Sequence, residues 1–487
     1  MTPLETFLRK GFKTSKNFKT KFHERNPEGI WFSAMKMTTP IRDFVMSYAA
    51  RDPMRLHMPG HKGYSLLGFE VFDITEVAGA DSLYEADGII RESEQNASLL
   101  FGCPTYYSTE GSSQCIRTML YLTMLHAKEA GCERPLILAG RNAHKTFLSA
   151  VALLDMDVEW LYPEEDGGYL SCPISPAGLR KTLARLAEAH KCPAAVYLTS
   201  PDYLGNTVDI ASLAEVCHAH GVLLLVDNAH GAYLKFLTPS RHPMDLGADL
   251  CCDSAHKTLP VLTGGAYLHI GAHLPTGLRA QAKQALSLFG STSPSYLILQ
   301  SLDMANSVMA DAAFASSLAE TARRVERCCQ KMRENGLPAH CGEPLKLTLH
   351  PRDYGYTGVE LAEHLHQHDV ECEFADPDHL VLMITPSITE EDFSRLLEVL
   401  LSLPRRAPLL DVPPAIGTPE RVLSVREALL SPAETLPVEA CVGRVLAAAT
   451  VGCPPAVPIV VSGERIDRDA VAVFAYYGIT TCSVIKE

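Results

Sequence analysis

The chain has 487 residues, of which 47% are hydrophobic and 21% charged, and its formal net charge at pH 7 is −14. This length predicts two or three packed domains, and the composition is that of a folded protein. The acidic balance argues against a nucleic-acid-binding protein, and no apolar run approaches the roughly 20 residues that cross a bilayer. The 15 cysteines are scattered, often inside apolar runs, which favours a reducing cytoplasm over a disulfide framework.

The first 36 residues differ from the rest of the chain because they are rich in Lys and Arg. They lack the apolar core of a signal peptide. We therefore expect a flexible basic arm over residues 1–36. The alternative is a start codon assigned too early, with Met35 or Met37 as the more natural beginning.

Helix and loop are predicted from Met37 to about residue 95, and short apolar runs then alternate with helical stretches up to about residue 290. Strands of about five residues separated by helices predict a mostly parallel sheet with both faces covered. The runs are PLILAG, AAVYLT, GVLLLVD and GGAYLHIG. Because ligands of such sheets bind outside the carboxyl ends of the strands, the residues of chemical interest should directly follow the runs.

The remaining chain predicts two smaller units. A long helical segment, roughly residues 294–335, closes a large domain of residues 37–335. Mixed strands and helices predict a smaller α+β domain over residues 336–405, and a proline-rich linker and a compact C-terminal domain follow in residues 406–487. The expected fold class is therefore α/β, with these two units added to the large domain.

Gly111, Ser112 and Ser113 begin a predicted helix. Free N–H groups and hydroxyls at a helix start favour a phosphate site, and a plain N-cap is the alternative. His144 lies just beyond the run PLILAG, where a structural histidine is the alternative to a functional one.

The run GVLLLVD ends with Asp227, which Ala229 and His230 follow closely. A carboxylate at that strand end could serve as an N-cap, as a metal ligand or as the partner of a ring nitrogen. Lys257 lies in apolar surroundings, between an apolar run and a glycine pair. A desolvated lysine loses its proton easily and can form a Schiff base, whereas a lysine that snorkels at a strand end is the alternative.

Taken in chain order, these residues form the set that a pyridoxal phosphate enzyme needs, and no metal is part of it. Asp227 would hold the pyridine nitrogen protonated, so that the ring acts as an electron sink. Lys257 would carry the cofactor as a Schiff base, and His144 could stack on the ring. Each motif is weak alone, and the ordered set carries the hypothesis.

Several motifs point to one family. They are LHMPGHKG (56–63), DITEVAGADSLYEADGII (73–90), TEGSS (109–113), NAHKT (142–146), DNAHG (227–231), SAHKTLP (254–260), STSPSY (291–296) and CPPAVPIVVSGE (453–464). With them the chain from Met37 onward resembles the Orn/Lys/Arg decarboxylase family, which has fold type I of the pyridoxal phosphate enzymes. Ala456 stands where that family usually has glycine and Ser462 where it usually has proline, which leaves the local turn in question. The resemblance implies a short member without the N-terminal wing domain, so the wing-mediated decamer is not expected.

The resemblance also implies roles for the site residues. Contacts to the cofactor phosphate are expected from Ser112, Ser113, Ser254 and His256, and Gly111 and Ala229 complete the cofactor site. Thr292 would reach the phosphate of the neighbouring subunit, which makes the active unit at least a homodimer with shared sites. A capping box for the following helix is the alternative for that segment. The proton donor in the reaction would be Lys257 or His256.

The implied function is decarboxylation of arginine, lysine or ornithine to agmatine, cadaverine or putrescine and CO2, and the sequence does not single out the substrate. The main alternative is an aminotransferase or side-chain lyase of the same fold. It would need an arginine in the small domain to bind the α-carboxylate, and Arg352 is the candidate. A non-catalytic scaffold that uses the basic arm as its contact is a third reading, against which the intact set of Lys257, Asp227 and His144 argues.

Overall fold

The computed structural model describes residues 37–163, 168–411, 413–415, 417–448 and 455–487. The expected basic arm, residues 1–36, lies outside these ranges. Among the helices in the described ranges, none has both the length and the apolar character that crossing a membrane requires.

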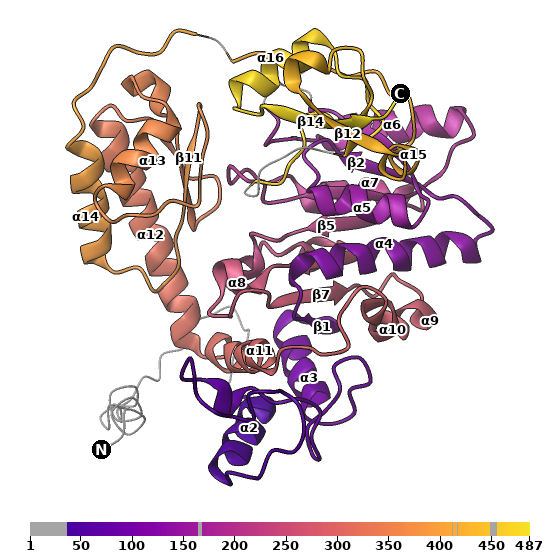
Figure 1. Ribbon diagram of the computed structural model, residues 1–487, viewed down its shortest axis with the longest axis vertical. Helices are drawn as coiled ribbons and strands as arrows, with labels where there is room; N and C mark the ends of the chain where they lie inside the picture. The colour runs from indigo at the N-terminus through magenta and orange to yellow at the C-terminus, as the bar shows by residue number, and fades with distance from the viewer. Residues whose placement is uncertain (1–36, 164–167, 412, 416, 449–454) are drawn as a thin grey trace. The chain divides into compact units, whose positions relative to one another are not determined.

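The central element is a seven-stranded sheet with the strand order β1-β7-β6-β5-β4-β2-β3 (Figure 1). Its strands are β1 (Thr105–Ser108), β2 (Leu136–Gly140), β3 (Asp157–Leu161), β4 (Pro193–Thr199), β5 (Leu223–Asp227), β6 (Leu250–Asp253) and β7 (Ala266–Ile270). Strands β2 to β6 are parallel to one another, whereas β7 pairs antiparallel with both of its neighbours, β6 and β1.

The direction of β7 corrects the expectation that GGAYLHIG is one of the parallel strands. Only the four-residue helix α8 (Ala255–Thr258) lies between β6 and β7. Such a short helix does not carry the chain back along the sheet, so β7 returns in the opposite direction. All residues of β7 are buried, so its apolar run looks the same in either direction.

Helices cover both faces of the sheet. One face packs against α4 (Gly111–Glu129) and α5 (Lys145–Leu153), and the other against α6 (Pro176–Glu188) and α7 (Ile210–Ala219). The other helices up to residue 334 are α2 (Pro40–Ala50), α3 (Ile89–Phe101), α9 (Thr276–Arg279), α10 (Ala282–Ser287), α11 (Tyr296–Met309) and α12 (Ala312–Glu334), with short 3-10 helices η1 (Glu70–Phe72), η2 (Ala232–Phe236) and η3 (Pro243–Leu246).

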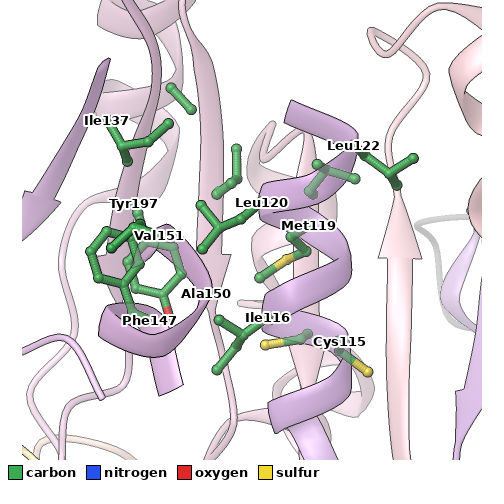
Figure 2. Packing of buried hydrophobic residues seen from close by; sticks show 14 of the residues in the cluster. Cys115, Ile116, Met119, Leu120, Leu122, Ile137, Phe147, Ala150, Val151 and Tyr197 are labelled. Atoms are coloured by element: carbon green, nitrogen blue, oxygen red, sulfur yellow. The ribbon is translucent and has the colours of Figure 1, made fainter. Parts of the chain in front are cut away.

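Successive residues of a strand supply the two cores in turn. On β4, Tyr197 belongs to the core under α4 and α5, and its neighbour Val196 to the core under α6 and α7. Figure 2 shows Phe147 of α5 beside Tyr197, with Met119 and Leu120 of α4 in the same cluster. These contacts anchor α4 and α5 to the sheet, and the first residues of both helices carry candidate site residues.

The long helical segment expected over residues 294–335 consists of two helices, α11 and α12. The break lies at Asp311, whose Oδ1 accepts a hydrogen bond of 2.9 Å from the backbone N–H of Ala313. This side-chain acceptor satisfies an N–H group at the start of α12, which makes Asp311 an N-cap inside an otherwise continuous helical pattern.

The last part of the chain has two small antiparallel sheets. The first has the order β10-β11-β9-β8, with β8 (Ala339–His340), β9 (Lys346–Leu349), β10 (Phe374–Ala375), β11 (Leu380–Met383), α13 (Gly358–His366), α14 (Glu390–Leu401) and η4 (Pro351–Tyr354). The second has the order β12-β14-β13, with β12 (Ala433–Pro437), β13 (Leu446–Ala448), β14 (Thr481–Ile485), α15 (Val425–Leu429), α16 (Arg468–Tyr476) and η5 (Val438–Ala440). The domain boundaries proposed at residues 335 and 405 both fall in connections between these elements.

Candidate active site

A cavity of about 160 Å³ lies at the carboxyl ends of the parallel strands. Much of its polar lining comes from residues that end β2, β4 and β5 or closely follow them, as parallel-sheet topology predicts. The lining residues are Asn142, His144, Leu170, Thr199, Pro201, Tyr203, Asp227, Ala229, His230, Lys257, Glu373, Pro455 and Val457.

Asp227 ends β5, and its side chain is held in place by several donors. It is 3% exposed. Tyr197 Oη donates to Oδ2 at 3.0 Å, and the backbone N–H of Ala229 donates to Oδ1 at 3.2 Å. Cys252 Sγ donates to Oδ1 at 3.6 Å. Burial raises the pKa of Tyr197 well above its ordinary value, so the phenol keeps its proton and stays a donor. A carboxyl group fixed in this way can stabilise a positive charge that develops in the cavity.

Lys257 lies on α8 directly after β6, and its Nζ is 2.8 Å from Nε2 of His230. His230 is buried. Burial, together with the nearby charges of Lys257 and Lys346, lowers the pKa of His230 well below its ordinary value. The imidazole is therefore neutral near pH 7. No role was predicted for His230 from the sequence, although it lies in the motif DNAHG.

His144 is the N-cap of α5. Its Nδ1 accepts a hydrogen bond of 3.1 Å from the backbone N–H of Thr146 and lies 2.9 Å from Thr146 Oγ1. Burial lowers the pKa of His144 to about 4, although Asp227 acts in the opposite direction. The ring is therefore neutral, which suits contact with another aromatic ring in a dry cavity.

The start of α4 brings several hydroxyl groups together. Ser254 Oγ donates to Ser112 Oγ at 2.8 Å, and Ser113 Oγ lies 3.1 Å from Thr146 Oγ1. Gly111 has φ +71°, and a Cβ there would meet open space. Hydroxyls and N–H groups at the start of a 19-residue helix form a suitable site for an anion such as a phosphate.

Six of the expected site residues do not line the cavity, namely Gly111, Ser112, Ser113, Ser254, His256 and Thr292. His256 Nδ1 lies 3.0 Å from the carbonyl oxygen of Gly265, and burial lowers the pKa of this histidine. Thr292 is exposed in the connection before α11. Ser295, and not Thr292, caps that helix by accepting from the N–H of Ile298. The role of Thr292 toward a neighbouring subunit stays a prediction.

Arg352, the candidate carboxylate clamp of the aminotransferase alternative, has other partners. Its Nη2 lies 2.7 Å from Asp411 Oδ1, and its Nη1 donates to Tyr476 Oη at 2.9 Å. Asp378 Oδ1 lies 3.5 Å from Nη1. Arg352 does not line the cavity. The arginine that the aminotransferase alternative requires is therefore not supplied by this residue.

The C-terminal motif reaches the cavity through Pro455 and Val457. Ala456 between them has φ +57°, a left-handed conformation that favours glycine. Its carbonyl oxygen accepts a hydrogen bond of 2.9 Å from the N–H of Lys145, at the start of α5. Ala456 is therefore in a strained conformation that glycine, the residue expected here from the family resemblance, would adopt without strain. Ser462 is buried, and its Oγ has no hydrogen-bond partner among the described residues.

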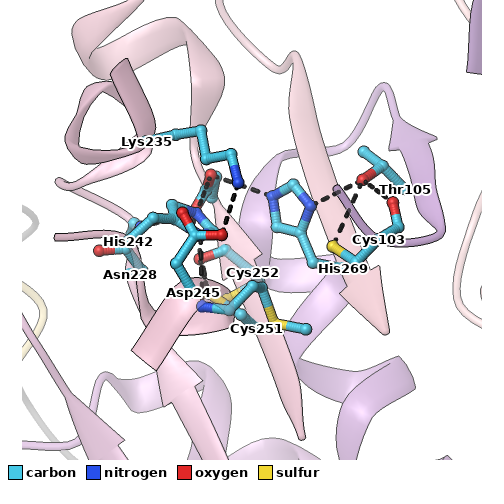
Figure 3. A network of polar contacts seen from close by, with 12 residues as sticks. Cys103, Thr105, Asn228, Lys235, His242, Asp245, Cys251, Cys252 and His269 are labelled. Carbon is cyan, nitrogen blue, oxygen red and sulfur yellow. Dashed lines mark hydrogen bonds and ion pairs between the residues drawn. The ribbon is translucent and has the colours of Figure 1, made fainter. Parts of the chain in front are cut away.

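Next to Asp227, Asn228 begins a buried polar network (Figure 3). Asn228 Nδ2 donates to Asp253 Oδ1 at 2.6 Å, and Nε2 of both His242 and His269 lies 3.0 Å from Oδ2. Burial alone would raise the pKa of Asp253, but the two imidazoles outweigh it and lower that pKa. The network ties the end of β5 to the end of β6, and thus Asp227 to the helix that carries the lysine.

Several cavity residues were not predicted from the sequence, because their local pattern marks them weakly or not at all. Thr199 pairs with Asp227 across the strands, and its buried Oγ1 has no hydrogen-bond partner among the described residues. Tyr203 Oη donates to Glu373 Oε1 at 2.7 Å. The apolar strand ending at Thr199 is the one signal that could have found that residue.

Comparison with known proteins assigns the chain to a family. The profile described as Orn/Lys/Arg decarboxylase, major domain, matches residues 39–348, and the profile of that family's C-terminal domain matches residues 418–483. The arginine decarboxylase of Halalkalibacterium halodurans is 28% identical over 89% of this chain and 92% of that protein.

Solved structures agree on the fold. The lysine decarboxylase of Francisella novicida superposes with a TM-score of 0.74 at 16% identity, over 93% of this chain and 82% of that one. Lysine decarboxylase A of Pseudomonas aeruginosa gives a TM-score of 0.75 at 18% identity, over 93% and 81%. The predicted fold class is thereby confirmed. The chain is a decarboxylase and belongs to the Orn/Lys/Arg decarboxylase family.

Proposed function

We propose that the chain binds pyridoxal phosphate in this cavity and decarboxylates a basic amino acid to the corresponding amine and CO2. One observation carries the proposal: a single cavity is lined by Lys257, Asp227 and His144. These are the amine, the carboxylate and the flat ring that such an enzyme needs.

The residues present fit the cofactor. The hydroxyls of Ser112, Ser113 and Ser254 would hold the phosphate at the start of α4. Thr199 offers a buried, unpartnered hydroxyl to a ligand in the cavity. When bound, pyridoxal phosphate supplies an electron sink for the electron pair of the Cα–carboxylate bond.

The chain's own side chains complete the chemistry. Asp227 would stabilise a proton on the ring nitrogen of the cofactor, and neutral His144 would pack beside that ring. We assign the return of a proton to Cα to Lys257 Nζ. His256 was the other candidate, but its Nδ1 is engaged with Gly265 and it does not line the cavity.

The carboxylate of Glu373 in the cavity favours a substrate with a positively charged side chain. Among the residues that line the cavity, Glu373 and Asp227 are the two with carboxylates. Asp227 is buried and is assigned to the ring nitrogen, whereas Glu373 is partly exposed and accepts a hydrogen bond from Tyr203 at Oε1. A carboxylate in a largely apolar cavity favours a guanidinium or ammonium group. Because relatives named arginine decarboxylase match the chain at about 28% identity, arginine is the substrate to test first.

The test is to supply arginine, lysine and ornithine side by side and to measure amine, CO2 and keto acid. We expect one amine with an equal amount of CO2, and keto acid as the main product would favour the aminotransferase alternative. Glu373→Gln should raise KM for that substrate by about tenfold or more, since it removes a charge-assisted contact. Glu371→Gln, an exposed change two residues away, is the matched control and should leave KM unchanged.

We also propose a homodimer with shared sites, because Thr292 is exposed in the single chain and the family resemblance places it at the partner's phosphate. A reducing cytoplasm is the compartment we propose, since the cysteines in the described part of the chain are free.

A further inference from the structure

Three buried side chains, Glu343, Lys346 and His230, form a continuous line from the small domain to the partly exposed side chain of Lys257, the proposed catalytic lysine. Glu343 Oε1 lies 2.8 Å from Lys346 Nζ, which lies 3.0 Å from His230 Nδ1. His230 Nε2 in turn lies 2.8 Å from Lys257 Nζ. Neither Lys346 nor Glu343 lines the cavity.

Lys346 has the surroundings of an ammonium group. It is 1% exposed and Glu343 is 2% exposed, so either charge alone would be costly in this place. Its Nζ also donates to the carbonyl oxygen of Asp202 at 3.1 Å. The three protons of an ammonium thus match three acceptors, namely Glu343 Oε1, the Asp202 carbonyl and His230 Nδ1.

The geometry then decides the tautomer of His230. If Nδ1 accepts from Lys346, the proton of the neutral ring is on Nε2 and points at Lys257 Nζ. A nitrogen that accepts such a hydrogen bond must have its lone pair free of a proton.

We propose that the Lys346–Glu343 ion pair fixes the tautomer of His230, with the proton on Nε2, and thereby keeps Lys257 as a neutral amine. Lys346 and Glu343 are positioning residues, because they act on Lys257 through His230. The inference rests on the proposed function for its purpose. An amine condenses with an aldehyde by forming an N=C bond and releasing water, and only the unprotonated amine has the lone pair that starts this step.

Other groups near the line act in both directions, because the carboxylate of Asp227 lines the same cavity as Lys257 and favours a charged ammonium there. The pKa of His230 is lowered first by burial and then by Lys257 and Lys346, and His144 and His256 lower it further. The ring of Tyr203 lies 6.0 Å from Lys346 Nζ, and Tyr233 Oη donates to Glu343 Oε2 at 3.4 Å. The ion pair is therefore the charged group in direct contact with Nδ1.

The first test reads the tautomer directly, by 15N NMR of the cofactor-free full chain labelled at the histidine rings. The His230 signals are assigned by their loss in His230→Gln. We expect Nε2 to be protonated and Nδ1 unprotonated near neutral pH, and this preference to be lost in Lys346→Met. A proton on Nδ1 in the unmodified protein, or the same tautomer in Lys346→Met, would overturn the inference.

The second test measures the reactivity of Lys257 by competitive acetylation at several pH values, read by mass spectrometry of its peptide. We expect its apparent pKa to lie well below the ordinary lysine value of about 10.4 and to rise by about one unit or more in Lys346→Met. Lys235→Met is the matched control, since Lys235 pairs with Asp245 at 2.6 Å and does not touch His230. An ordinary pKa in the unmodified protein, or an equal shift in the control, contradicts the proposal.

A double variant guards against loss of the fold. Glu343→Gln with Lys346→Met leaves no unpaired buried charge, and near-ultraviolet circular dichroism verifies its packing. It should show the same shift of the Lys257 pKa, and an unshifted pKa in this folded variant contradicts the inference. Neither test needs cofactor or substrate. If the tautomer and the reactivity are as expected but no amine forms in the substrate assay, the proposed function alone is refuted. If amine forms but the tautomer or the reactivity differs from the expected one, the inference alone is refuted.

Discussion

Tyr197 on β4 donates a hydrogen bond of 3.0 Å to Oδ2 of Asp227 on the neighbouring strand β5. The register pairs Thr199 with Asp227, and Tyr197 lies two residues before Thr199 on the same face. The phenol therefore reaches the carboxylate from within the buried core, while the cavity stays open to a ligand. This contact ties the packing of the sheet to the group that would face the cofactor ring.

Replacing Asp227 with Ala should lower kcat by about a hundredfold or more, because a preorganised charge is lost from a dry site. The cofactor should still bind, though more weakly, since the hydroxyls at the start of α4 remain. Tyr197→Phe removes one hydrogen-bond donor to Asp227 and keeps the carboxylate, so we expect a smaller decrease in kcat. Steady-state kinetics with cofactor titration measure both, and near-normal turnover in Asp227→Ala would remove its assigned role.

Replacing Lys257 with Ala should abolish the visible absorbance of bound cofactor and essentially all turnover, because the amine that joins the cofactor is gone. Absorption spectra and amine assays measure the two effects. Lys181→Ala, an exposed change on α6, is the control and should match the unmodified protein. Turnover in Lys257→Ala comparable to that of the unmodified protein is the result that would exclude the mechanism.

The stability of the protein should fall as the pH drops from about 6.5 to 4, in part because of His144. Its folded-state pKa of about 4 is below the ordinary value of 6.5, so the unfolded chain binds the proton first. Between these two pH values, the titration of His144 should lower the free energy of unfolding by up to about 3 kcal/mol. His144→Asn keeps an N-cap acceptor for Thr146 without a titrating ring, so its urea midpoint should depend less on pH in this range.

The exposed change His368→Gln provides the control for this measurement and should leave the pH dependence as it is. Equal slopes for His144→Asn and the unmodified protein would mean that His144 titrates normally.

Much of the site followed from sequence because its parts are local. Asp227 could be placed since an apolar run ends there, and ligands of parallel sheets lie at such ends. Ser112 and Ser113 follow from the start of a helix. These features depend on a few consecutive residues, so their pattern in the chain predicts their place in the fold.

The rest depends on packing between distant segments. Lys346 contacts His230 across 116 positions of sequence, and no periodic pattern links the two. The direction of β7 was wrong in the sequence prediction because a fully buried strand has the same apolar run either way. The break at Asp311 was missed because the helical pattern continues on both sides of the cap.

Ala456→Gly should leave stability unchanged or raise it by up to about 1 kcal/mol, because Ala456 is in a left-handed conformation that glycine adopts without strain. The matched control is Ala472→Gly, an exposed position inside helix α16, which should lose about 0.5–1 kcal/mol. Urea unfolding of both variants measures the difference. Equal losses at the two positions would show that the turn does not have this conformation.

The last prediction is that each active site is built from two chains, with Thr292 acting on the neighbour's phosphate site. It rests on the exposure of Thr292 and on Ser295, rather than Thr292, capping α11. Lys257→Ala and Thr292→Ala chains, each impaired alone, are mixed and allowed to exchange. In a mixed dimer one site then carries both changes and the other carries neither.

Random exchange makes half of the dimers mixed, so about a quarter of all sites should be intact if the dimer is two-fold symmetric. The control pairs Lys257→Ala with Asp227→Ala, which belong to the same chain's site and leave no intact site in a mixed dimer. Activity should therefore recover in the first mixture and stay low in the second, as measured by amine formation after exchange is verified by mass-tagged subunits. If the first mixture never exceeds the sum of its parents despite exchange, Thr292 serves its own chain or none, and the shared-site model fails.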